Sequence, residues 1–259
     1  DFPNQKILDF NDDLYVYGSD EIWNNQNPFF GFDPYFFGKD NSKKKISYGA
    51  SIGSSNLKNN PNINLIKNYL LKFEKISVRD LESQKFVTHC IGLKVPIVLD
   101  PCFLIDIEEI IKKKISYNFR DKNYILIYGD YFSKKHIENI KLLSKSNKWK
   151  IISLGFYNSW ADKNFIAVNP LDLVHSIINS KLVFTSMFHG AMLSYKYKKQ
   201  FWISEDPYRK NKLSFFVDYF SLKNRYLENM NDSLINYGNN KNKFDDLLNL
   251  SKNFLKKNL

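Results

Sequence analysis

The segment Ser186-Met187-Phe188-His189-Gly190 contains the side chain best suited to proton transfer. It follows a short apolar run and leads into a helical pattern. Backbone N–H groups at the start of a helix favour an anion, and imidazole readily gains or loses a proton near neutral pH. His189 is therefore a candidate acid or base, with Ser186 and Gly190 beside the anion. The alternative is a structural histidine that caps the turn.

A second candidate is Arg79, which directly follows the apolar run 75–78. A guanidinium group at a strand end can bind a phosphate or carboxylate through two parallel hydrogen bonds. The alternative is a surface ion pair with the neighbouring Asp80 or Glu82.

The segment YGSDEIWN forms a third candidate, because a polar turn of Gly18, Ser19 and Asp20 follows an apolar run. Asp20 and the adjacent Glu21 could act on the hydroxyl group of an acceptor. Trp23 could stack on a sugar or simply fill the core.

The fourth candidate is the small-residue turn YGASIG, in which Ser51 offers a hydroxyl group and Gly53 lets the backbone approach a ligand. A plain tight turn is the alternative. The chain has neither a Walker-type lysine nor a GxGxxG motif, so nucleotide recognition through those motifs is not supported.

The elements that must position these residues alternate between short apolar runs and helical patterns. This alternation is typical of a doubly wound α/β protein with parallel sheets. In such sheets ligands bind beyond the carboxyl ends of the strands, where all four candidate turns lie. The predicted strands are 14–17, 45–48, 75–78, 96–99, 124–128, 150–154, 182–185 and 201–203. The predicted helices are 63–73, 81–90, 134–146, 170–179 and 190–198.

The alternation predicts two lobes, with residues 1–105 in the first, 106–122 as a helical connector and 123–259 in the second. The strands of each lobe should form one parallel sheet. At the carboxyl terminus, apolar residues recur at helical spacing between lysines. We expect this helix to pack against a lobe, the alternative being a helix on a membrane surface.

Composition limits the class of protein. The 259 residues carry a formal net charge of +11, but no long basic run is interleaved with aromatic residues, so we expect no nucleic-acid partner. The two cysteines lack metal-ligand spacing and fit a reducing compartment. Neither a membrane-spanning run nor a signal peptide is visible. We expect a cytoplasmic protein with at most peripheral contact with the inner face of a membrane.

Five segments, in order along the chain, resemble the polysaccharide pyruvyl transferase family. They are GSDEIWN, KISYGASIG, ISVRD, VLDP and TSMFHG. The later segment 206–226, which contains Arg209 and Arg225, is similar to the carboxyl-terminal region of that family. The resemblance implies two facing Rossmann-like lobes, as in GT-B glycosyltransferases, with phosphoenolpyruvate (PEP) in the cleft. It also implies transfer of a pyruvyl group onto two sugar hydroxyl groups as a ketal.

Residue roles follow from the same resemblance. Arg79 would hold the PEP anion and His189 would be the catalytic acid or base, with no metal and no cofactor beyond PEP as the donor substrate. Two features depart from the family pattern: Met187 stands where some members have a basic residue, and the first lobe is expected to be incomplete at its N-terminus. The remaining predicted substrate-binding residues are Gly18, Ser19, Asp20, Ser51, Gly53, Ser186, Gly190 and Arg209.

Two other functions are compatible with these residues. One is a GT-B-type glycosyltransferase, whose sugar nucleotide could place its diphosphate at the same helix start. The other is a non-catalytic sugar-binding or assembly subunit. The sequence leaves open the acceptor sugar and its linkage, whether a lipid carries it, and the oligomeric state.

Overall fold

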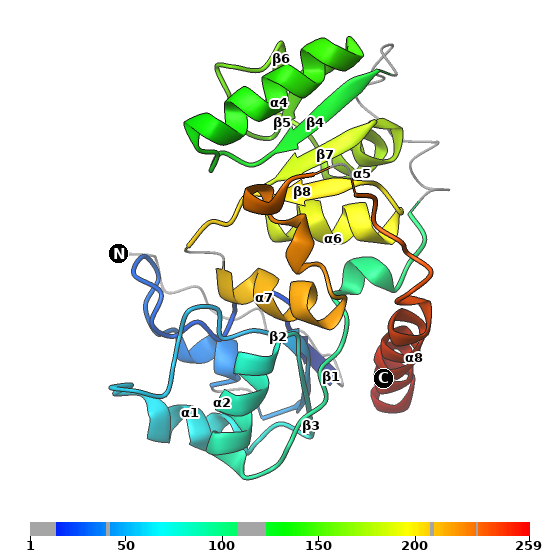
Figure 1. The fold of residues 1–259 in the computed structure, drawn as a ribbon. Coiled ribbons are helices and arrows are strands. Elements are labelled where there is room, and N and C mark those ends of the chain that lie inside the picture. Colours follow the sequence, from blue (N-terminus) through cyan, green and yellow to red (C-terminus); the bar gives the residue numbers. More distant parts are fainter. Residues whose placement is uncertain (1–13, 40–41, 108–122, 208–209, 232) are drawn as a thin grey trace. The chain divides into compact units, whose positions relative to one another are not determined.

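A computed structural model describes residues 14–39, 42–107, 123–207, 210–231 and 233–259 (Figure 1). The chain divides into two compact units. Unit 1 comprises residues 1–101 together with 247–259, and unit 2 comprises residues 102–246. The sequence had instead assigned 247–259 to the second lobe; the structure groups these residues with the first because they pack there, as described below.

Unit 1 contains a parallel sheet of β1 (Leu14–Tyr17), β2 (Lys44–Ala50) and β3 (Lys75–Val78), in that order. The helices α1 (Ile63–Leu70) and α2 (Leu81–Ile91) lie side by side (Figure 1). A short helix, η1 (Pro34–Phe37), precedes β2. These elements match the predicted order, which confirms the parallel α/β pattern for this unit.

The predicted fourth strand, 96–99, is reduced to a single parallel bridge between Val78 and Ile97. The Val78 N–H donates to the Pro96 carbonyl at 3.0 Å, and the Val98 N–H donates to the Val78 carbonyl at 2.9 Å. Proline has no N–H to extend the ladder, which is one physical reason for the short pairing.

Unit 2 is built on a five-stranded parallel sheet. Its strands are β4 (Tyr124–Tyr128), β5 (Lys150–Leu154), β6 (Lys163–Phe165), β7 (Leu182–Thr185) and β8 (Phe201–Ile203). Their spatial order, β6-β5-β4-β7-β8, is the order of a Rossmann-type sheet. The sequence reading missed β6, which has three residues and only one apolar side chain. The helices are α4 (Lys134–Asn147), α5 (Pro170–Asn179), α6 (Phe188–Lys196) and α7 (Lys210–Tyr219).

Each unit buries its own apolar core. In unit 1, Trp23 is completely buried and stacks on Phe37, with ring centroids 5.9 Å apart. In unit 2, the alternate residues Ile125 and Ile127 of β4 face a core that also contains Phe184 of β7. Successive side chains of a strand point to opposite faces of the sheet, and Leu126 between these two residues is also completely buried, so both faces of the sheet are covered at β4.

The carboxyl-terminal helix α8 (Lys241–Asn258) packs as predicted, through its second half. Leu247 and Ser251 are buried, and the ring of Phe254 lies 6.2 Å from that of Tyr48. The Ser251 hydroxyl accepts from the Leu99 N–H at 2.8 Å. This helix therefore closes the unit 1 core from a distant part of the chain.

Candidate functional site

Arg79 lies where the strands of the unit 1 sheet end. Its N–H donates to the carbonyl of Ala50, the last residue of β2, at 3.4 Å. Its Nη1 donates to the Ser19 carbonyl, just after β1, at 2.7 Å. Through its backbone N–H and its guanidinium group, Arg79 thus links the carboxyl end of β3 to those of β2 and β1, which is where ligands bind in open α/β sheets.

The charge partner of Arg79 is Asp100. Nη1 of Arg79 is 3.0 Å from a carboxylate oxygen of Asp100, and the side chains are only 5% and 4% exposed. The exposed Asp20 lies 3.8 Å from Nη2. The predicted alternative, a surface pair with Asp80 or Glu82, is wrong, because Glu82 pairs with Lys85 and Asp80 caps α2.

Ser51 and Gly53 belong to the network around that cap. The buried Asp80 accepts from the Ser83 N–H at 2.7 Å and from the Ser51 hydroxyl at 2.7 Å. Ser51 Oγ in turn accepts from the Gly53 N–H at 3.1 Å. With these bonds made inside the protein, Ser51 holds the turn after β2 against the start of α2.

Gly18 allows the turns after β1 and β2 to meet. Its φ is +131°, and a Cβ atom there would lie 2.3 Å from the Tyr48 carbonyl oxygen. A side chain would therefore separate the two strand ends. This close approach positions Ser19 and Asp20 beside Arg79, so all six predicted site residues of unit 1 come from adjoining turns.

Of the two roles that the sequence left open for Trp23, the structure supports core packing. Trp23 does not face a ligand; it fills the core, and its indole N–H donates to the Phe36 carbonyl at 2.9 Å. The exposed aromatic side chains are instead Phe29 and Phe30, which are 82% and 79% exposed. The run Asn-Pro-Phe-Phe-Gly could have signalled this, because proline and glycine around two phenylalanines indicate a loop.

The second group of predicted residues lies at the switch point of the unit 2 sheet. The strand order reverses between β4 and β7, and a crevice beyond such a point is the usual ligand position. Here the Thr185 hydroxyl donates to the Tyr128 carbonyl at 2.6 Å, and the Ser186 N–H donates to the same oxygen at 3.2 Å. Ser186 is completely buried and its Oγ accepts from the Tyr131 N–H at 3.4 Å.

His189 lies in the first turn of α6, which begins two residues earlier than predicted. The N-cap residue is Met187, whose N–H donates to the Thr185 hydroxyl at 3.0 Å. His189 is half-buried, and its ring centroid is 5.5 Å from that of Phe188. The first turn of α6 contains no acidic residue. No carboxylate of that turn competes for the positive end of the α6 dipole, which favours an anion beside His189.

Gly190 brings α6 close to the sheet. A Cβ atom at this position would lie 2.1 Å from Thr185 Oγ1 and 2.9 Å from the ring of Tyr128. Only glycine allows the helix start to pack directly on the ends of β4 and β7, and this packing orients His189.

Sequence reasoning assigned no role to two polar residues near these sites. One is Asp100, which is a charged residue after the apolar run 97–99. The other is Asn158, which is buried and donates to the Gly129 carbonyl at 2.9 Å and to Ser153 Oγ at 2.8 Å. Asn158 therefore holds the turn after β4 against β5, a contact that spacing does not reveal.

Of the two arginines in segment 206–226, Arg209 lies outside the described residues. Arg225 is 1% exposed, stacks 3.8 Å from the ring centroid of Trp202 and donates from Nε to the Phe201 carbonyl at 3.0 Å. Burial lowers the pKa of Arg225 to about 10. These contacts give Arg225 a structural role at the edge of the sheet.

Comparison with known proteins identifies the family. A family model described as polysaccharide pyruvyl transferase matches residues 1–206. No curated protein matches the chain. Among the described residues, no helix is both long and apolar enough to cross a membrane. Because the matched region covers most of the chain and contains both the Arg79 and the His189 segments, the chain belongs to the polysaccharide pyruvyl transferase family and is a transferase.

Proposed function

We propose that this transferase moves the pyruvyl group of PEP onto a sugar of a polysaccharide or its precursor, forming a ketal. The observation that carries the proposal is the position of His189. It lies in the first turn of a helix at the switch point of a Rossmann-type sheet, in a chain of this family. That position combines a group able to transfer a proton with an environment that favours an anion.

The donor requires positive potential, because PEP carries a phosphate and a carboxylate. The N-terminal turn of α6 supplies part of it in unit 2, and the fixed charge of Arg79 supplies part in unit 1. We propose that both act on the same PEP molecule, as they would in a two-lobed GT-B arrangement. Asp100 reduces the net charge at Arg79 but also holds its guanidinium in one orientation before the substrate binds.

The proposed reaction has two additions at the same carbon. An acid, His189, protonates the methylene carbon of PEP, so that C2 becomes an oxocarbenium centre and the methylene becomes a methyl group. One sugar hydroxyl adds to C2 and loses its proton. The C2–O bond to phosphate then breaks, phosphate leaves with that electron pair, and a second hydroxyl adds and loses its proton. The two hydroxyl groups release two protons: one returns to His189, which gave its own proton to carbon, and the departing phosphate takes up the other, so the enzyme ends in its starting protonation state.

The acceptor is proposed to bind near the polar turn after β1. Asp20 is 76% exposed, and a carboxylate oxygen can accept a hydrogen bond from a sugar hydroxyl. Phe29 and Phe30 offer exposed aromatic faces of the kind that stack on sugars.

The test measures phosphate release from PEP with a panel of pyrophosphate-linked sugars. We expect release only when both PEP and a suitable acceptor are present, with a new ketal methyl signal in the NMR spectrum of the product. Binding of a sugar nucleotide without binding of PEP would contradict the proposal and favour a glycosyltransferase. Tight PEP binding without phosphate release for any acceptor would instead favour a non-catalytic member.

A further inference from the structure

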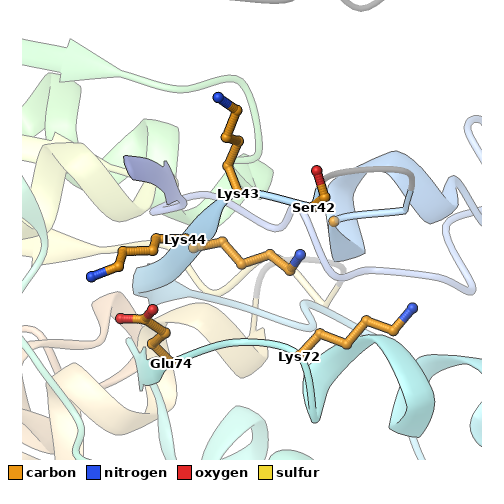
Figure 2. Close-up of a pocket in the computed structure, with 7 residues that line it drawn as sticks. Ser42, Lys43, Lys44, Lys72 and Glu74 are labelled. Atoms are coloured by element: carbon orange, nitrogen blue, oxygen red, sulfur yellow. The ribbon is translucent and has the colours of Figure 1, made fainter. Parts of the chain in front are cut away.

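Unit 1 has a pocket of about 500 Å³ at the amino end of β2. Figure 2 shows Lys72 and Glu74, from the segment after α1, across from Ser42, Lys43 and Lys44. The lining residues are Gly38, Ser42, Lys43, Lys44, Lys45, Lys72 and Glu74.

Positive charge dominates this pocket. The described lining residues include four lysines and one carboxylate, that of Glu74. The charge of Lys72 lowers the pKa of Lys45, so the ammonium groups of these two lysines repel each other, and an anion bound between them would relieve that repulsion. The shared feature of the lining is therefore an excess of hydrogen-bond donors that carry charge.

Lys45 is the unusual member, because its side chain is only 3% exposed. Its stem passes over Gly38, where a Cβ atom would lie 2.9 Å from Cδ of Lys45. Burial, and secondarily the charge of Lys72, lower the pKa of Lys45. An anion in the pocket would offset both effects. Glycine at position 38 leaves the room that this buried lysine needs.

The pocket is separate from the Arg79 site. Arg79 contacts Ala50 at the carboxyl end of β2, whereas the pocket surrounds Lys44 and Lys45 at the amino end. A seven-residue strand spans about 20 Å at roughly 3.3 Å per residue. One PEP molecule cannot reach both ends.

We propose that this lysine pocket is a second anion site, which binds the phosphate or diphosphate group of a ligand other than PEP. Lysine binds phosphate as a point charge, and several lysines together favour a group with more than one negative charge over a single carboxylate. Two sources share this chemistry, a soluble phosphorylated compound and the phosphate headgroup of a lipid.

The test is calorimetric titration of the full chain with inorganic pyrophosphate at low salt. Lys72→Met removes an exposed lysine of the pocket, and Lys45→Met removes the buried one. We expect each to weaken binding about tenfold or more, as for the loss of a charge-assisted hydrogen bond. Lys67→Met is the matched control, since Lys67 is an exposed lysine of α1 outside the pocket lining.

Thermal melts accompany each titration, so that a folding defect in Lys45→Met is recognised and Lys72→Met then decides the outcome. Unchanged pyrophosphate affinity in folded Lys72→Met, or an equal loss in Lys67→Met, would overturn the pocket assignment. Flotation with phosphatidylglycerol vesicles distinguishes the sources. Flotation that Lys72→Met abolishes assigns the pocket to a lipid phosphate, and pyrophosphate binding without flotation assigns it to a soluble ligand. If the unaltered chain neither binds pyrophosphate nor floats with the vesicles, the proposal is refuted.

Discussion

The burial and the partners of Arg79 and His189 could not be predicted from their neighbours in the sequence. Arg79 is buried and paired with Asp100, so it is both a candidate anion-binding group and part of the structure. His189 is half-buried at a helix start whose polar neighbours are largely engaged in holding strand ends together. At this scale, the main experimental task is to separate chemical roles from structural ones.

Replacing Arg79 with alanine should weaken PEP binding by about 2–5 kcal/mol, because a fixed charge is lost. It should also destabilise unit 1 by about 3–5 kcal/mol, since Asp100 is left buried and unpaired. Calorimetric PEP titration and denaturant unfolding measure the two effects. Asp100→Asn is the matched control: it breaks the same ion pair but keeps the cation, and we expect PEP affinity to survive. Equal PEP affinity in the two folded variants would leave Arg79 with a structural role alone.

Replacing His189 with glutamine should lower turnover by about 10²–10⁴-fold while most of the PEP affinity remains. Steady-state phosphate release and PEP titration separate the two quantities. His175→Gln provides the same substitution elsewhere in unit 2 and should retain full turnover. A folded His189→Gln variant with normal turnover would refute the acid–base role and favour a histidine that only caps the turn.

At the scale of elements, α8 shows how a distant segment completes a core. Ser251 donates to the Leu247 carbonyl within the helix and accepts from the Leu99 N–H outside it. Leu99 directly precedes Asp100. The helix thus supports the backbone beside the charge partner of Arg79.

Three alanine substitutions in α8 test this support. Leu247→Ala should destabilise the protein by about 2–5 kcal/mol, because it leaves a cavity. Ser251→Ala should cost about 1–3 kcal/mol, because the buried Leu99 N–H loses its acceptor. Leu250 is 43% exposed, so Leu250→Ala should change stability by no more than about 0.5 kcal/mol. Equal losses across the three variants, measured by urea unfolding, would contradict the packing described here.

At the scale of the whole molecule, the net charge of +11 suits anionic substrates, and protonation of buried groups adds a dependence of stability on pH. The partly buried His175 of α5 is one such group. Burial lowers its pKa below the ordinary value of 6.5, and the charge of Asp172 only partly opposes this.

The sign of the effect follows from linkage. Unfolded His175 binds its proton at higher pH than folded His175 does. Its contribution to stability is therefore complete above about pH 6.5 and is lost as the pH falls through the lower, folded pKa. We expect Tm to decrease below pH 6.5, and His175→Gln to reduce that decrease. Thermal melts from pH 7.5 to 5 provide the measurement, and an unchanged acid slope in the variant would exclude this contribution.

The sequence by itself determined the fold class, the order of most elements and the family. Strand and helix periods are local properties, so the runs at 75–78 and 182–185 could be recognised without tertiary information. The polar turns after those runs could be identified as site candidates for the same reason. The resemblance of five ordered segments led to the family that the matched region confirms.

Only the tertiary structure decided which partners those candidate residues have. Arg79 pairs with Asp100 rather than with its neighbour Asp80, because parallel strands bring residues distant in the chain to one edge. Trp23 fills the core, whereas Phe29 stays exposed, although the two aromatic residues lie close together in the sequence. Burial and charge pairing depend on contacts between distant segments, and sequence spacing carries little information about them.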